Sequence, residues 1–351
     1  MLLDSLDRRR FEPILLTWID AGQEYQPASK KYEWLRHVRK HKLDFGPLWF
    51  AKRLIRDRKI SLVHGMLDTG NFYGGLLKLF SRNLVFVASE RSSKRKLSRF
   101  QTIHKAPMHR IADITIANSE QGKDFVSSMG VKEDCLTFIP NGLDTDRFSP
   151  VEESQKEKLR KQLFGFDCNR KVLLSVGSIY ETKNQLGLVH AFADAALQDT
   201  RLVLVGKPKL DYLDQVKNAI NQRQVNDKVD IFPPTSNVDK LYKSSDGLVL
   251  NSKFEGTPNV VLEGMSSGLP VIATNVGDVS RYVDDGFGWL VNAEIHEQMV
   301  SALSAFDQCS LDQLGFMGVQ ARKAIEDCGL SKEKLAERHE ALYLELLGRP
   351  N

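Results

Sequence analysis

Residues 251–289 have the sequence NSKFEGTPNVVLEGMSSGLPVIATNVGDVSRYVDDGFGW, which is the most informative part of this chain. The apolar run Gly247–Leu250 directly before it predicts a buried strand. Thr257 is a suitable N-cap, and Pro258 suits the first helical position because a missing N–H costs nothing there. The stretch therefore predicts a strand, a short loop and a helix.

The start of this predicted helix is a candidate anion site. The amides of Asn259, Val260 and Val261 would have no intrahelical partner, and they coincide with the positive end of the helix dipole. Glu255 precedes this end, and Glu263 follows more than one turn inside the helix. A pyrophosphate bound there would have one carboxylate on each side, which suits a nucleotide-sugar.

The two glutamates also belong to a known kind of motif. Glu-x7-Glu within EGTPNVVLEGMSSGLPVIAT resembles the signature of family-4 retaining glycosyltransferases, which have the GT-B fold. Further matches follow in the family's order: IADITIANSE (111–120), IPNGLDTDRFSP (139–150), VLLSVGSIYETKNQ (172–185), LVLVGK (202–207) and DGFGWLV (285–291). The resemblance covers nearly the whole chain and is strongest over residues 111–291.

The resemblance implies a role for each candidate residue. Glu263 would bind ribose hydroxyls, Glu255 the sugar hydroxyls and Lys183 the departing diphosphate. The other expected donor-binding residues are Gly177, Ser178, Thr257, Pro258, Asn259, Val260 and Val261. The implied reaction is transfer of a hexosyl group, with retention, from a nucleoside-diphosphate sugar to a saccharide or lipid-linked saccharide. The resemblance also implies that this reaction belongs to glycan or surface polysaccharide biosynthesis and that it needs no cofactor.

Several positions depart from the family pattern. The family often has Arg beside the glycine where this chain has Gly177-Ser178, so a single ammonium, Lys183, must neutralise the diphosphate. The family's His after the fourth strand of the first domain has no counterpart in Ala88-Ser89-Glu90-Arg91. For His64, which ends an apolar run, a structural role and contact with the acceptor remain equally open.

Short apolar runs alternate with helix-length segments throughout, which is typical of parallel strands buried on both faces. The expected strands lie at 13–17, 61–64, 84–88, 114–118, 136–139, 172–176, 202–205, 229–232, 247–250, 271–274 and 288–291. They predict an α/β protein with two Rossmann-like domains facing a central cleft, which is the GT-B class that the resemblance implies. The expected divisions are an acceptor-side domain (1–150), a nucleotide-sugar domain (151–330) and a C-terminal helix (331–351), which the resemblance implies returns to the first domain.

The beginning of the chain differs from the family. The resemblance implies a strand and a glycine-rich loop ahead of a helix, and this chain starts inside that helix, at LLDSLDRRRFEPILL. We expect a truncated or misannotated start rather than a natural protein without these elements. We also expect the sheet to lack an inner strand and therefore to be less stable than that of the parent protein.

Basic residues are concentrated in the first half. Residues 1–150 contain 26 Lys and Arg against 17 Asp and Glu, and the densest stretches are 30–42, 52–59 and 91–99. Two interpretations stay open: a solvated face, or contact with an anionic membrane surface or a phosphate-bearing lipid acceptor. No nucleic-acid-binding motif accompanies the charge. The sequence shows no signal peptide, and its four cysteines are scattered, which predicts a cytoplasmic protein that visits the inner face of the membrane as a peripheral one.

Metal binding and two other functional classes are the alternatives to this interpretation. Asp144-Thr145-Asp146 looks like a metal-binding Asp-x-Asp, but its setting in IPNGLDTDRF fits an interdomain linker with turn residues. No His, Cys, Asp or Glu cluster has metal-ligand spacing, so no metal is expected. The alternative to an enzyme is a catalytically impaired GT-B scaffold or nucleotide-binding protein. A glycoside hydrolase is disfavoured because both glutamates belong to one strand–helix turn.

Overall fold

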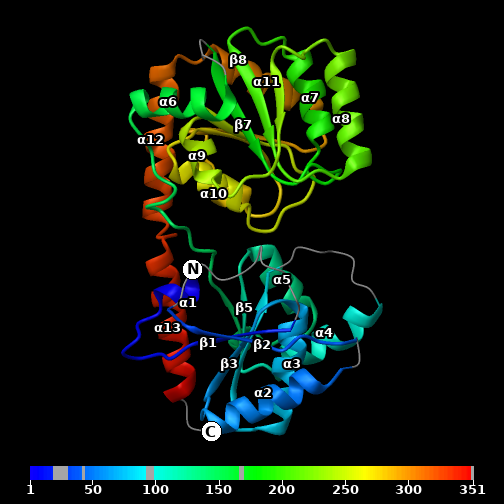
Figure 1. Cartoon of the computed structure of the whole chain (residues 1–351), viewed down its shortest axis with the longest axis vertical. Coiled ribbons are helices and arrows are strands. Elements are labelled where there is room, and N and C mark those ends of the chain that lie inside the picture. The colour runs from blue at the N-terminus through cyan, green and yellow to red at the C-terminus, as the bar shows by residue number, and fades with distance from the viewer. Residues whose placement is uncertain (19–30, 42–43, 92–98, 166–169, 349–351) are drawn as a thin grey trace. The chain divides into compact units, whose positions relative to one another are not determined.

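The computed structural model describes residues 1–18, 31–41, 44–91, 99–165 and 170–348. The chain divides into two compact units (Figure 1). The first unit consists of Met1–Gly142 and Lys332–Asn351, and the second of Leu143–Ser331. The predicted boundary after residue 150 thus falls inside the second unit. The reason is that the Leu143 N–H donates to the Leu330 carbonyl at 2.7 Å, so the linker pairs with the second unit.

The described residues of the first unit form six short strands and the helices that connect them. Its strands are β1 (Ile14–Thr17), β2 (Glu33–Arg36), β3 (Leu62–Gly65), β4 (Val85–Glu90), β5 (Ile114–Ala117) and β6 (Leu136–Phe138). Its helices are α1 (Leu2–Ser5), α2 (Gly46–Asp57), α3 (Leu67–Phe80), α4 (Arg99–Ile111), α5 (Glu120–Ser128) and α13 (Lys332–Gly348), with a 3-10 turn η2 (Glu133–Cys135).

The second unit repeats the strand–helix alternation. Its strands are β7 (Lys171–Val176), β8 (Thr200–Val205), β9 (Val229–Phe232), β10 (Gly247–Leu250), β11 (Val271–Thr274) and β12 (Gly288–Val291). Its helices are α6 (Glu153–Phe164), α7 (Gln185–Asp194), α8 (Leu210–Gln222), α9 (Val238–Lys243), α10 (Asn259–Ser266), α11 (His296–Gln308) and α12 (Leu311–Asp327), with a 3-10 turn η3 (Val279–Arg281).

Every strand pair among the described residues of the two units is parallel. The second unit has one sheet, in the order β12-β11-β10-β7-β8-β9, while the first has two: β1-β2 and β3-β4-β5-β6. Register in the second sheet pairs apolar residues, such as Leu174 with Val203 and Leu248 with Val271. Two parallel α/β units of this kind agree with the predicted Rossmann-like architecture.

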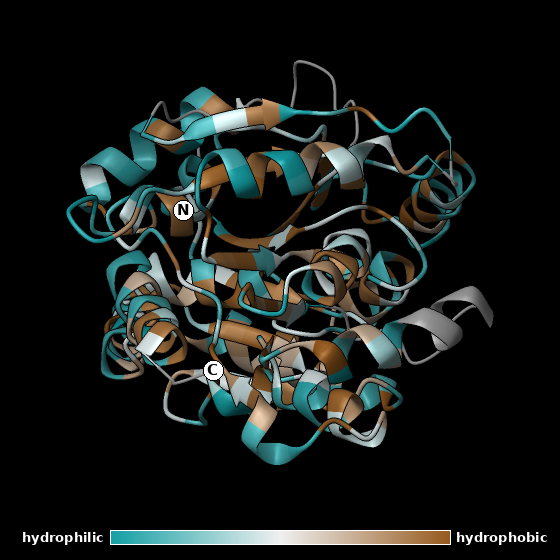
Figure 2. Cartoon of the chain, turned by 90° about the horizontal axis from the view of Figure 1, so that it is seen from below, coloured by the Kyte–Doolittle hydropathy of each residue, from teal (hydrophilic) through white to brown (hydrophobic). Residues whose placement is uncertain are grey.

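The core of the second unit lies on both faces of its sheet. Successive residues of a strand point to opposite faces, so Val172 and Leu174 pack in one apolar cluster and Leu173 in the other. In Figure 2, which views the chain from below, the strand segments near the middle of the picture are mostly brown, while the helices alternate between brown and teal along their length. Burial on both faces is why the strands are unbroken Val, Leu and Ile runs.

All of the predicted strands are present, with ends within two residues of the expected ones. One strand, β2, was missed because it lies in the charge-rich stretch at 30–42. Helix α13 packs in the first unit, where Leu335, Ala336 and Leu346 join the apolar cluster around Val87. In the part of the chain described here, no helix combines the length and apolarity needed to span a bilayer.

Candidate active site

The candidate site lies where β7 and β10 end. The two strands are neighbours in the sheet, and the loops that follow them hold residues 177–184 and 251–258. The loops are joined by hydrogen bonds: the Lys253 N–H donates to the Thr182 carbonyl at 2.8 Å, and the Asn251 side-chain amide to the Asn184 carbonyl at 3.1 Å. Carboxyl ends of adjacent parallel strands are the usual ligand position in open α/β sheets.

Lys183 and Glu255 form an ion pair across these loops. The Lys183 Nζ donates to the Glu255 Oε1 at 2.5 Å, and the two side chains are only 20% and 13% exposed. The residues are far apart in sequence, and both were predicted as catalytic. The structure brings these two together.

The turn after β7 has a backbone that requires glycine. Gly177 has a φ of +151°, and a Cβ built on Gly206 would lie 1.8 Å from the Gly177 carbonyl oxygen. Gly177 lies beside Lys183, because a Cβ on it would be 3.7 Å from the lysine Cε. Ser178 is exposed, and its carbonyl accepts a hydrogen bond from the Gln185 side chain at 3.0 Å. Gly177 and Ser178 thus lie in an open loop next to the predicted cation.

The start of α10 corrects the prediction about its amides. The helix begins at Asn259 with Pro258 as N-cap at ψ 80°, one residue later than expected, and no side chain caps it. The Asn259 N–H donates to the Thr257 carbonyl at 3.0 Å, and the Val261 N–H donates to the Pro258 carbonyl at 2.9 Å. Among the described residues, therefore, Val260 alone of the three predicted amides has no backbone partner.

Glu263 lies in a second polar cluster, on the first turns of α10. Its Oε2 accepts a hydrogen bond from the hydroxyl of the fully buried Tyr242 at 2.8 Å. Burial raises the pKa of Glu263 above its ordinary 4.5, while the Tyr242 bond and the Arg147 charge act in the lowering direction. Arg147 is held by Asp239 at 2.9 Å and by the Ser236 carbonyl at 2.7 Å. A partly buried carboxylate oriented by tyrosine is suited to accept hydrogen bonds from vicinal hydroxyls.

Three residues near these groups escaped the sequence reasoning. Tyr242 and Arg147 carry no local signal, because their partners are distant in the chain. Gly277 has a φ of +59°, and a Cβ there would lie 2.3 Å from the Gly256 carbonyl oxygen, so it allows the β11 loop to approach the Glu255 loop. The turn-like NVGD sequence around Gly277 could have indicated it.

His64 has a structural environment in the first unit. Its Nδ1 lies 2.6 Å from the Tyr343 hydroxyl and its Nε2 2.6 Å from the Ser89 hydroxyl. Burial, with the charges of His339 and Arg91, lowers its pKa to about 3, so the ring is neutral at physiological pH. Both ring nitrogens are engaged, which favours the structural role of the two predicted for it.

The remaining predictions fall on linker and basic residues. Asp144 Oδ1 accepts from the Arg147 N–H at 3.3 Å, as expected of a turn. In the described ranges, no three His, Cys, Asp or Glu side chains gather as metal ligands do. Most of the basic stretch at 91–99, the ends of that at 30–42, and Cys168 lie outside the described residues.

Comparison with known protein families matches both units. The family described as Glycosyltransferase Family 4 matches residues 1–147, and that described as Glycosyl transferases group 1 matches residues 155–312.

Curated relatives cover part of the chain. Mannosylfructose-phosphate synthase of Agrobacterium fabrum is 29% identical over 194 residues, which are 52% of this chain and 42% of the relative. UDP-Gal:alpha-D-GlcNAc-diphosphoundecaprenol alpha-1,3-galactosyltransferase of Escherichia coli is 27% identical over 222 residues, or 60% and 54%. The chain therefore spans about half the length of the curated relatives it matches.

Solved structures resemble the chain more completely. Anabaena HepE in complex with UDP has a TM-score of 0.81 at 16% identity, covering 90% of this chain and 87% of that one. A glycosyltransferase from Rickettsia africae has a TM-score of 0.81 at 18% identity, covering 96% and 91%. Identities this low bear on the fold alone. Since the family models match both units in order and the fold agrees, the chain belongs to the family-4 glycosyltransferases, with the GT-B fold.

Proposed function

We propose that this chain is a retaining glycosyltransferase that moves a hexosyl group from a nucleoside-diphosphate sugar to a saccharide or lipid-linked saccharide. The observation that carries the proposal is the Lys183–Glu255 pair at 2.5 Å. The Lys183 ammonium could neutralise the diphosphate, and the Glu255 carboxylate beside it could accept hydrogen bonds from the sugar hydroxyls. The pair thus matches the two adjoining parts of a nucleoside-diphosphate sugar.

The residues would act in the following way. Glu255 orients the sugar by its hydroxyls, and Glu263, held by Tyr242, binds the ribose. The bond between the sugar C1 and the leaving phosphate oxygen breaks as C1 bonds to the acceptor oxygen on the same face. The acceptor proton passes to the departing diphosphate, whose charge Lys183 and the Val260 N–H stabilise. No protein nucleophile and no metal are required in this scheme.

The names of two similar proteins indicate which nucleotide to test first for binding. HepE was solved in complex with UDP, and the Escherichia coli relative is named for a UDP-Gal donor. Calorimetry with UDP, GDP and ADP on the whole chain tests the nucleotide, and we expect one of them to bind. Chelation with EDTA should leave that binding unchanged. Absence of binding to all three would favour the catalytically impaired scaffold instead.

Transfer itself is tested with Lys183→Ala and Glu255→Gln. Loss of a cation at the leaving group should lower the rate of sugar transfer by about 100-fold or more, as for a removed transition-state donor. Lys209→Ala is a matched control, because that lysine is exposed and pairs with Glu181 at 2.6 Å. The anomeric configuration of the product, read by NMR, tests retention. Wild-type transfer in both site variants would refute the assignment.

We also propose that the first unit docks on an anionic membrane face. Phe45 and Trp49 at α2, with Leu79 and Phe80 at the end of α3, are each more than half exposed. The Lys52 Nζ lies 5.3 Å from the Trp49 ring centre and 4.9 Å from that of Phe80. Exposed aromatic rings with a lysine between them are the composition of interfacial segments.

Vesicle sedimentation tests this docking. The chain should pellet with anionic vesicles at low salt, and less at high salt because surface charge is screened. Trp49→Ser with Phe80→Ser should reduce pelleting severalfold, whereas Phe316→Ser, which removes an equally exposed ring from α12, should not. Equal pelleting of all variants with neutral and anionic vesicles would contradict the proposal.

A further inference from the structure

Three strand ends in the first unit carry polar residues that no step of the proposed reaction uses. Strands β4, β5 and β6 are neighbours in one parallel sheet, so their carboxyl ends lie at the same edge. Arg91 directly follows β4, Asn118 directly follows β5, and Asn141 comes shortly after β6. Ligands of open α/β sheets bind at such an edge. These residues are therefore a candidate for a second binding site.

Hydrogen bonds join the three side chains. The Arg91 Nη2 donates to the Asn141 Oδ1 at 2.6 Å, and the Asn118 side-chain amide donates to the same oxygen at 3.1 Å. Asn118 and Asn141 are only 7% and 8% exposed, so close packing holds both amides in place. The Arg91 guanidinium is thus oriented before any ligand arrives, which reduces the entropy lost on binding.

The positive charge of Arg91 has no counter-ion. Among the described residues, Asn141 is the only hydrogen-bond partner of the guanidinium, and no carboxylate pairs with it. Although Arg91 is partly exposed, the protein around it displaces water and lowers its pKa below the ordinary value. The carboxylate of Glu90, its neighbour in sequence, pairs instead with Lys105 at 2.7 Å. A partly desolvated cation without a partner favours an anion from outside the chain.

Two histidines near Arg91 are neutral. Burial lowers the pKa of His64 to about 3 and that of His339 to about 4, and the charge of Arg91 acts in the same direction on both. The two rings stack with their centroids 5.9 Å apart. Of these three side chains, Arg91 alone is charged at neutral pH, so it is the group that an anion would meet.

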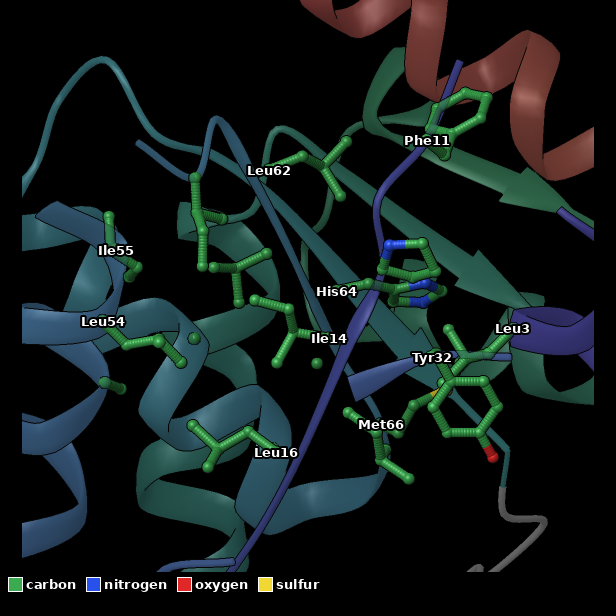
Figure 3. Close-up of a pocket in the computed structure, with 18 of the residues that line it drawn as sticks. Leu3, Phe11, Ile14, Leu16, Tyr32, Leu54, Ile55, Leu62, His64 and Met66 are labelled. Atoms are coloured by element: carbon green, nitrogen blue, oxygen red, sulfur yellow. The ribbon is translucent and has the colours of Figure 1, made fainter. Parts of the chain in front are cut away.

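The cavity of about 880 Å³ in the first unit offers no comparable place for an anion. Figure 3 shows mostly apolar side chains around it, such as Leu16 and Leu62. His64 lies on its wall, but Arg91 and the two asparagines do not line it. An anionic group is therefore expected at the strand ends and not in this cavity.

We propose that Arg91, oriented by Asn141 and Asn118, binds a phosphate or carboxylate group of the acceptor. Both groups present paired oxygens that match the planar guanidinium, so a bidentate, charge-assisted pair forms with the N–H groups that Asn141 leaves open. The assignment to the acceptor rests on the proposed function, in which the second unit binds the donor. An acceptor without an anionic group lacks this contact and binds more weakly.

NMR shifts of the Asn118 and Asn141 side-chain amides, measured on the whole chain, test the site. Inorganic phosphate and glucuronate are the anionic probes, and glucose is the neutral one. We expect at least one anion to shift both amides saturably and glucose to leave them unchanged. The anion that binds more tightly identifies phosphate or carboxylate as the preferred group. Equal shifts with glucose, or no shift with any probe, would overturn the inference.

Arg91→Gln should weaken binding of that anion about tenfold or more, because a charge-assisted pair is lost. Arg82→Gln, which removes an exposed arginine from the same unit, is the matched control and should bind the anion like the parent. Unchanged anion binding in Arg91→Gln would overturn the role of Arg91.

Asn141→Asp tests the same charge without removing the arginine. The new carboxylate keeps an acceptor for Arg91 and Asn118 but neutralises the guanidinium from within the chain. Anion binding, read from the Asn118 amide, should therefore be lost, and the melting temperature should not fall. If Arg91→Gln does not fold, this variant decides: anion binding that survives in it would overturn the inference.

Failure of this inference is distinguishable from failure of the proposed function. Nucleotide binding to Arg91→Gln, measured by calorimetry, should match the parent, because the donor site lies where β7 and β10 end. Sugar transfer by Arg91→Gln with an unchanged KM for the acceptor would overturn the inference and leave the glycosyltransferase standing. If no nucleotide binds while the anion still shifts the Asn118 amide, the glycosyltransferase assignment fails, and with it the acceptor as the source of the anion.

Discussion

Glu263→Gln provides the sharpest test of the nucleotide site. The substitution keeps the shape of the side chain and its acceptor for the Tyr242 hydroxyl at 2.8 Å, but removes the charge. A hydrogen bond from a ribose hydroxyl to a charged acceptor contributes roughly 1.5–3 kcal/mol. Its loss should weaken binding of UDP, or of whichever nucleotide binds, by about tenfold to 150-fold. Titration calorimetry on the whole chain measures it directly.

The same carboxylate gives the binding a pH dependence with a defined sign. Burial raises the pKa of Glu263 above 4.5, and the ionised form is the acceptor, so affinity should fall as pH drops through that raised pKa. Tyr242→Phe removes a bond that lowers this pKa, so the fall should begin at a higher pH. In Glu263→Gln this step should disappear.

Stability separates a binding role from a structural one. Because the pKa of Glu263 is raised in the folded protein, the ionised carboxylate destabilises the fold at pH values above that raised pKa. This destabilisation is absent below pH 4.5, the ordinary pKa of the group in the unfolded chain. Glu263→Gln should therefore not lower the melting temperature at pH 7. The exposed Glu297→Gln serves as the control for affinity. A Glu263→Gln protein that binds nucleotide like the parent, with an unchanged pH profile, would refute the reasoning.

Three further predictions concern the framework around the site. Asp246 is buried between Lys156 at 2.6 Å and Arg160 at 2.5 Å, so Asp246→Asn should cost about 3–5 kcal/mol and lower the calorimetric melting point of the second unit by about 6–20 °C. Burial raises the pKa of Asp246, but the charges of Lys156 and Arg160 outweigh it and bring that pKa below its ordinary 3.8. The ionised carboxylate therefore stabilises the fold above pH 3.8, and this stabilisation should be lost as the pH falls further. Acid titration followed by circular dichroism would show the loss. Gly206→Ala should destabilise the second unit by about 1–3 kcal/mol and weaken nucleotide binding, because the new Cβ displaces the Gly177 carbonyl; unchanged binding would mean that this turn does not contact the ligand. Gly315→Ala in α12, where a Cβ meets nothing within 4 Å, should instead stabilise by about 1 kcal/mol in chemical denaturation.

The sequence by itself determined the strands and the parallel class of the sheets. Runs such as Val271–Thr274 are apolar at every position because both faces are buried, and that signal is local. Strand β2 escaped because EWLR, with charged ends, has no such run. The motif around Glu255 and Glu263 could likewise be recognised from residue order, since loop, turn and helix are consecutive.

Only the tertiary structure decided which groups meet. The Lys183–Glu255 pair joins two loops and the Tyr242–Glu263 bond joins two helices, and side-chain partners so far apart in the chain leave no periodic pattern in the sequence. The amides of α10 could not be foreseen because the ψ of Pro258, 80°, is set by its surroundings rather than by residue type. The division of the first unit's strands between the sheets β1-β2 and β3-β4-β5-β6 is also a tertiary property, because the sequence shows apolar strands but not which of them pair.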